Sequence, residues 1–226
     1  TALGYAALST NITGSDNTAL GKGTLFANTA SNNTAVGTSA LTANTTGTAN
    51  VAVGSLSGDA LTTGHYNTMM GHGSLSADTK GTRSVAIGMQ ALAAQNFTSE
   101  TSVYNTAVGF QAGLSVTTGT ENTLIGATAG DLMTTGSSNT SVGYFSMSNA
   151  VVTGNDNTAV GKSAGYNLTS GSNNLFLGHD AGFTGSPGGN ITTGSNAIVL
   201  GDENIGDAHI QVDWTVASDA RDKTDF

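Results

Sequence analysis

The side chains best suited to chemistry in this sequence are four histidines and fifteen carboxylates. His72 and His179 each follow a glycine that recurs along the chain, and imidazoles gathered on a symmetry axis would bind a metal ion. Other copies of that glycine are followed by Lys22, Phe110 or Lys162, a mixture typical of a solvent-exposed position. We therefore expect no metal site and no cofactor.

The carboxylates are spread about one per repeat or fewer, with one cluster at residues 202–207. Asp16, Glu121 and Asp156 lie in polar turns, where a single carboxylate binds calcium poorly, so turn formation explains them better. A glycosidase needs two carboxylates across a groove. A fold that brings distant acids together would supply such a pair, so a glycan-cleaving protein is an alternative.

These residues belong to a repeat whose signature is the pentapeptide Asn33-Thr34-Ala35-Val36-Gly37. From Gly4 to Gly201 its final glycine recurs with a spacing of mostly 17 residues, and this period predicts a repeat architecture. Similar pentapeptides end at Gly21, Gly54, Gly71, Gly88, Gly109, Gly126, Gly143, Gly161 and Gly178.

Each pentapeptide has the pattern of a short β-strand. The residue before the glycine is a large aliphatic, and the residue two positions earlier is mostly β-branched, as in Val51-Ala52-Val53-Gly54. Positions two apart face one side of a strand, so we predict that the aliphatic side is half-buried. The small residue between them, usually Ala, suggests close packing on the opposite face as well.

The rest of each repeat predicts one coil of a solenoid. The glycine is expected to turn the chain through positive φ or close backbone approach, a second short strand follows, and a polar Thr-Thr-Gly-like turn closes the coil. We therefore predict an all-β parallel β-solenoid of about 11–12 short coils, roughly 55 Å long at one strand spacing per coil. The stacked asparagines would favour left-handed turns or hydrogen-bond along their column.

Composition excludes several kinds of partner. The net charge is −9 with only six scattered Lys and Arg residues, so we expect no nucleic-acid binding. No apolar run approaches the ~20 residues of a membrane helix, so we expect no membrane insertion. The chain begins inside a repeat, which suggests a segment of a longer protein.

The segment Ser84-Val85-Ala86-Ile87-Gly88 resembles the head repeats of YadA-type trimeric autotransporter adhesins, and near matches span residues 1 to 201. This resemblance implies a left-handed parallel β-roll and a homotrimer. Similar repeats occur in bacteriophage tail fibres and tail spikes. The 17-residue period is longer than is usual in the adhesin heads, so we expect a longer outer turn.

After Gly201 the repeat ends, which divides the chain into a repeat region at 1–206, a terminal strand and connector at 207–217, and a different segment at 218–226. That last segment resembles the start of the endosialidase-type intramolecular chaperone domain. The resemblance implies a domain that trimerises a phage fibre and then cleaves itself off with a Ser–Lys pair. Ser218 and Lys223 match its positions.

A Ser–Lys pair works when the lysine is neutral and accepts the serine proton. Free lysine has a pKa of about 10.4, so Lys223 would need burial in a pocket. The three residues after Lys223 do not build one. We therefore expect self-cleavage only in a longer precursor, and no enzyme activity from this chain alone.

Two stretches are longer than the period requires, at residues 94–104 and 183–191. Insertions in solenoids form surface loops, which often bind partners. Phe97, Tyr104 and Phe183 are therefore candidates for contact with a host cell-surface glycan or protein receptor. Loops that bind nothing are an equally good interpretation.

Together these features predict a structural and adhesive segment of a trimeric phage tail fibre, located in the virion and carrying a C-terminal self-cleavage junction. The first alternative is the head of a bacterial trimeric autotransporter adhesin on the cell surface. The second is a glycan-degrading tail spike.

Overall fold

The computed structural model of the chain describes residues 1–207, so the predicted terminal strand within 207–217 and the segment 218–226 lie almost entirely outside this description. The described residues form fourteen strands and no helix. Twelve strands make one sheet in chain order, β6 and β8 excepted, and those two pair with each other. The strands are β1 Ala2–Leu3, β2 Thr18–Leu20, β3 Thr34–Val36, β4 Val51–Val53, β5 Thr68–Met70, β6 Gly81–Thr82, β7 Val85–Ile87, β8 Thr101–Ser102, β9 Thr106–Val108, β10 Thr123–Ile125, β11 Thr140–Val142, β12 Thr158–Val160, β13 Leu175–Leu177 and β14 Ile198–Leu200.

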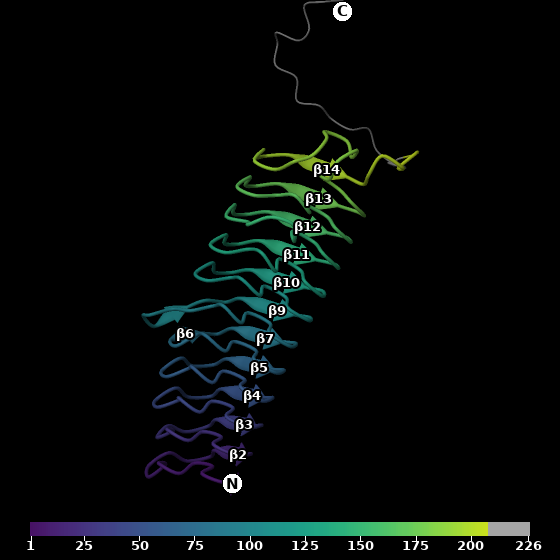
Figure 1. The fold of residues 1–226 in the computed structure, drawn as a ribbon. Coiled ribbons are helices and arrows are strands. Elements are labelled where there is room, and N and C mark those ends of the chain that lie inside the picture. Colours follow the sequence, from purple (N-terminus) through teal and green to yellow (C-terminus); the bar gives the residue numbers. More distant parts are fainter. Residues whose placement is uncertain (208–226) are drawn as a thin grey trace, which may run out of the picture.

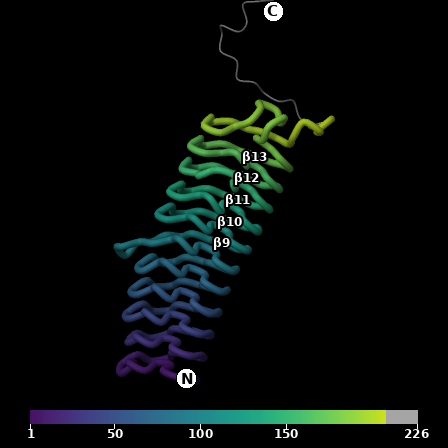
Figure 2. The backbone as a smooth tube through the Cα atoms, viewed as in Figure 1, coloured from purple at the N-terminus to yellow at the C-terminus, as the bar shows by residue number. Residues whose placement is uncertain are grey.

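Every strand of the large sheet is parallel to its neighbours and in register with the repeat. Thr106 of β9 pairs with Thr123 of β10, which pairs with Thr140 of β11. The coils are therefore stacked rungs of a rod, from the N-terminus at one end to β14 at the other (Figures 1 and 2). The predicted all-β parallel solenoid is confirmed.

The side of each strand that carries the small residue, and not the aliphatic side, faces the interior of the coil. The central residue of each strand, such as Ala52, Ala86 or Ala107, is fully buried. The flanking aliphatic and β-branched residues lie on the outside and are partly or largely exposed. The physical reason is the thinness of the coil, because its two sides lie too close together to bury large residues from every strand position.

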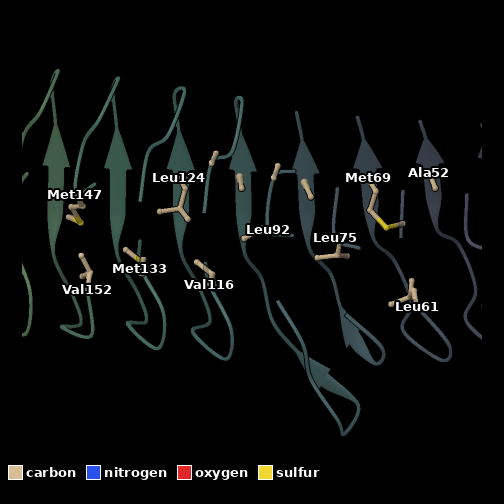
Figure 3. Close-up of a cluster of buried hydrophobic side chains, with 14 of the residues drawn as sticks. Ala52, Leu61, Met69, Leu75, Leu92, Val116, Leu124, Met133, Met147 and Val152 are labelled. Carbon is tan, nitrogen blue, oxygen red and sulfur yellow. The ribbon is translucent and has the colours of Figure 1, made fainter. Parts of the chain in front are cut away.

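The interior is filled by one large side chain where the facing residue is small. Leu75 and Leu92 enter the interior from the side opposite the sheet, where the facing strand residue is alanine (Figure 3). Leu41 is likewise fully buried. Where the strand offers Leu124, the opposite residue is Gly113, and a Cβ there would lie 2.6 Å from Leu124 Cδ1. Glycine thus stands opposite a large strand residue, which keeps the filled volume of the core similar from rung to rung.

The predicted second strand does not form. The residues after each corner glycine make consecutive turns, and residues of positive φ alternate with ordinary ones, as at Ser39 (φ 59°) and Leu41 (φ 50°). Hydrogen bonds between coils continue along this side, for example from Leu41 N to Ser57 O at 3.0 Å. The side is thus a parallel hydrogen-bonded stack without strand geometry.

The corner glycine is required for both reasons that its sequence position suggested. Gly109 has φ of +144°, and a Cβ at this position would lie 2.3 Å from the carbonyl oxygen of Gly126 in the next coil. Gly88 is similar, with φ of +134° and 2.1 Å to Gly109 O. Only glycine lets successive corners stack this closely.

The asparagine that opens each pentapeptide is buried and links neighbouring coils. Asn122 accepts a hydrogen bond at Oδ1 from the backbone N–H of Asn139 (2.9 Å) and donates from Nδ2 to Gly136 O (2.9 Å). The same pair of bonds recurs at Asn33, Asn50 and Asn157. The predicted hydrogen-bonded column is confirmed. The left-handed conformation falls instead on the residue before each asparagine, such as Asp16 or Asn32.

The column is interrupted where serine replaces asparagine, at Ser84. Gln95 Nε2 donates to Ser84 Oγ at 3.1 Å and to the buried Asp78 Oδ2 at 2.6 Å, while Gln95 Oε1 accepts from Asn105 Nδ2 at 2.9 Å. Asp78 also accepts from the backbone N–H groups of Gly81 and Phe97. The longer side chain of Gln95 therefore bridges the interruption of the asparagine column at Ser84.

Candidate interaction surfaces

The outer face of the large sheet carries two partly exposed columns that run along the rod. The residue before each corner glycine is aliphatic, and those on this face include Leu20, Met70, Ile125, Val160 and Leu177, exposed by 38–45%. The residues two positions earlier are mostly threonine, and the two columns together form what we call the outer strand face. Both columns are set by the strand register, so they are continuous over all twelve rungs.

An exposed apolar stripe of this extent is unusual on a parallel sheet. Parallel sheets usually have both faces covered, and a large exposed apolar patch marks a site of association. The buried face is occupied by the chain's own core, so the outer strand face is the one without a covering element among residues 1–207. This face is the leading candidate for contact with another chain.

The first insertion forms a small flap rather than a free loop. Strands β6 and β8 pair in parallel, Gly81 with Thr101 and Thr82 with Ser102, and project from the rod beside β7 and β9 (Figure 1). Phe97 packs inside the base of this insertion with only 8% exposure, so its ring is not presented to a receptor. Tyr104, in contrast, is 53% exposed.

The structure brings Tyr104 together with two residues that the sequence analysis did not select. Arg83 lies in the same column one coil earlier, and Tyr66 lies one coil before that. The Arg83 guanidinium carbon is 5.4 Å from the Tyr66 ring centroid and 5.8 Å from the Tyr104 ring centroid. Comparison of the residues preceding Asn67, Ser84 and Asn105 would have revealed this column.

Phe183 belongs to a second aromatic group, near the other end of the rod. The ring of Tyr166 makes edge contacts with Phe183 (5.5 Å between centroids) and Phe145 (6.2 Å), and Phe145 lies 4.1 Å from Tyr144. Phe183 is half-buried in this group. The positions of these four rings are therefore explained by their contacts with one another.

His179 lies with two carboxylates at the last coils. Its Nδ1 is 3.2 Å from Asp202 Oδ2 and 3.5 Å from Asp180 Oδ2, and the three groups lie within 4.8 Å of one another. The Asn204 backbone N–H, followed by the His179 hydrogen bond, holds the pKa of Asp202 below its ordinary value. The hydrogen bond between His179 and Asp202 accounts for this arrangement, and the absence of a metal site stays a prediction.

Two further carboxylates have perturbed acidity. Burial raises the pKa of Asp59 and of Asp131, and in Asp131 a hydrogen bond from Ser148 opposes the effect. They occupy the same column four coils apart, or roughly 19 Å at one strand spacing per coil. That separation is about twice the largest carboxylate distance of a glycosidase, so these two acids do not form such a pair.

Ser218 and Lys223 lie outside the described residues, so their self-cleavage role stays a prediction. Within residues 1–207 no helix is long and apolar enough to cross a membrane. No family model, curated protein or solved structure matches the chain.

Proposed function

We propose that the chain is a stiff structural and adhesive segment of a homotrimeric fibre of the phage tail-fibre type. The observation that carries this proposal is the outer strand face, whose aliphatic columns continue over twelve rungs without a cover among the described residues. Three copies packed side by side along their rods would bury these columns. The rod would then act as a spacer that presents its outward turns to a host surface.

The register of the face supports lengthwise packing. Successive strands stay in register with matching residue types, as in Val108, Ile125 and Val142, so a partner rod meets the same surface at every rung. Burial of apolar surface contributes about 25 cal/mol per Å², and such a long stripe supplies many such contacts. An assembly of parallel rods is therefore favoured over an end-to-end contact.

The assembly is tested by light scattering on the purified chain. We expect a trimer for the natural sequence, and a monomer for a variant with Val108→Lys and Ile125→Lys, because two ammonium groups would have to be buried in the interface. Leu132→Lys is the matched control, because Leu132 is an exposed aliphatic residue (37%) outside the sheet. This control should remain a trimer. A natural chain that stays monomeric at high concentration would contradict the proposal.

The phage setting, as opposed to a bacterial adhesin, rests on the resemblance at Ser218 and Lys223. The test uses the product of the full reading frame, expressed with and without Ser218→Ala. We expect two fragments on a denaturing gel for the natural sequence and one uncut chain for the variant, because the serine would be the nucleophile. Cleavage that continues in the variant would remove this part of the proposal.

A further inference from the structure

We infer that Tyr66, Arg83 and Tyr104 form a binding site for a carboxylated sugar within an acidic glycan. The inference deepens the adhesive role proposed above and rests on it for its biological meaning. We call these three residues the Tyr–Arg–Tyr column.

The first observation is that the guanidinium is held in place. Arg83 lies between two tyrosine rings, at 5.4 and 5.8 Å, and its Nη1 donates to Ser102 Oγ (2.7 Å) and Thr82 Oγ1 (3.1 Å). Its backbone N–H also donates to His65 O at 3.0 Å. The side chain is thus positioned before a ligand arrives, which lowers the entropy cost of binding.

The second observation is that Arg83 pairs with no carboxylate among the described residues 1–207. Within this range, the close contacts between basic and acidic side chains all involve histidines, and Glu100 lies 3.5 Å from His65 Nε2. Thr48 N–H donates to His65 Nδ1, so the proton sits on Nε2 and points to Glu100. Within residues 1–207, the hydrogen bonds of the Arg83 guanidinium both come from Nη1. The N–H groups on Nη2 and Nε are therefore left to bind an anion such as a carboxylate.

The third observation is the type of residue at these positions. All three have positive φ (61°, 64° and 56°), a conformation that disfavours bulky side chains. Other coils place mostly smaller residues in the same column, namely Asp16, Asn32, Ala49, Glu121, Ser138, Asp156, Asn173 and Asn196. Positive φ recurs in every coil, so what distinguishes this site is that two tyrosines and an arginine follow one another along the column.

The chemistry of the column fits an acidic sugar. A carboxylate would accept hydrogen bonds from the guanidinium, the flanking phenol hydroxyls would contact the sugar hydroxyls, and the C–H face of a pyranose packs on aromatic rings. Tyr66 and Tyr104 are 56% and 53% exposed and stand two strand spacings apart, about 10 Å. The next residue of the column is Glu121, whose negative charge would confine the ligand carboxylate to Arg83.

The test is calorimetric titration of the chain with an oligosaccharide of galacturonic acid, and with its methyl ester as the uncharged counterpart. We expect the acid to bind at least about tenfold more tightly than the ester, because a charge-assisted hydrogen bond is lost in the ester. Binding of the acid should weaken with added salt. Equal affinity for acid and ester, or no saturable binding of either, would overturn the inference.

The decisive variant is Arg83→Asn, which introduces the residue that other coils carry at this backbone conformation. We expect its melting temperature to be no lower than that of the natural chain and its affinity for the acid to fall at least about tenfold. Lys162→Asn removes the same charge from another exposed position and should leave binding unchanged. Unchanged binding in Arg83→Asn, or equal loss in Lys162→Asn, would contradict the site.

Tyr104→Phe provides an independent check, because it keeps the ring and the fold but removes one hydroxyl group. We expect a smaller loss of affinity than for Arg83→Asn, and an unchanged affinity would exclude the phenol from the site. Light scattering on the same samples separates the two proposals. A monomer that binds the acid contradicts the fibre proposal alone, whereas a trimer that does not bind contradicts the sugar site alone.

Discussion

Replacing Gly109 by alanine is expected to abolish the cooperative folding of the rod around β9 and β10. The new Cβ would lie 2.3 Å from Gly126 O, 2.6 Å from its carbonyl carbon and 3.1 Å from Ala127 N. These are backbone atoms of the next coil, which cannot rotate away as a side chain would. Because φ is also +144°, we expect the free energy of unfolding to fall by more than about 4 kcal/mol.

Thermal denaturation followed by circular dichroism, together with limited proteolysis, measures this loss. Gly23→Ala is the matched control, because Gly23 also has positive φ (+65°) but its Cβ would meet nothing closer than 3.8 Å. Ala6 already occupies the equivalent position in the first coil with φ of 57°. We expect Gly23→Ala to cost about 1 kcal/mol or less, and a similar cost at Gly109 would show that the coils do not stack as described.

Asn122→Ala should produce the second-largest effect. It removes the bond from Asn122 Nδ2 to Gly136 O and the bond from Asn139 N–H to Asn122 Oδ1, both 2.9 Å long. The Gly136 carbonyl and the Asn139 N–H would stay buried without these partners. Each unsatisfied buried group costs about 1–3 kcal/mol, so we expect a loss of roughly 2–5 kcal/mol in unfolding free energy.

The matched control is Asn149→Ala, which removes an asparagine whose hydrogen bond to Asn167 Oδ1 (2.7 Å) is solvent-exposed. Urea denaturation of both variants gives the comparison, and we expect Asn149→Ala to cost less than about 1 kcal/mol. Because a repeat rod can unfold in parts, the transition should be recorded with two probes. Equal effects of the two substitutions would mean that the asparagine column does not hold the coils together.

The sequence alone predicted the elements that depend on the period. Twelve copies of one pattern had to stack, because a single coil buries too little apolar surface by itself. The corner glycines and the column of asparagines followed from the same argument, since each residue type has a backbone or hydrogen-bond reason to recur. The structure confirms all of these features.

The facing of the strands could not be predicted, because alternation marks two faces without saying which one is inside. A β-branched column beside alanine usually indicates that the β-branched side packs on a core, and for the strand of Val51 and Val53 we predicted a half-buried aliphatic side. The strands turn their small residues inward because Leu41 or Leu75, from the opposite side of the coil, already fills the thin interior. The second side was also predicted wrongly as a strand, because alternating left-handed residues such as Ser39 leave no clear sequence signal.

The candidate sites show the same division. Two repeat spacings longer than 17 residues indicated the insertions, and hence Phe97, Tyr104 and Phe183. These spacings did not show that Phe97 is buried or that Tyr104 lies beside Arg83 and Tyr66. The sequence by itself determined the period of the rungs, the glycine at each corner and the asparagine that opens each pentapeptide. What only the tertiary structure decided was which side of the rung faces outward and which residues of different rungs meet, because both depend on contacts between coils.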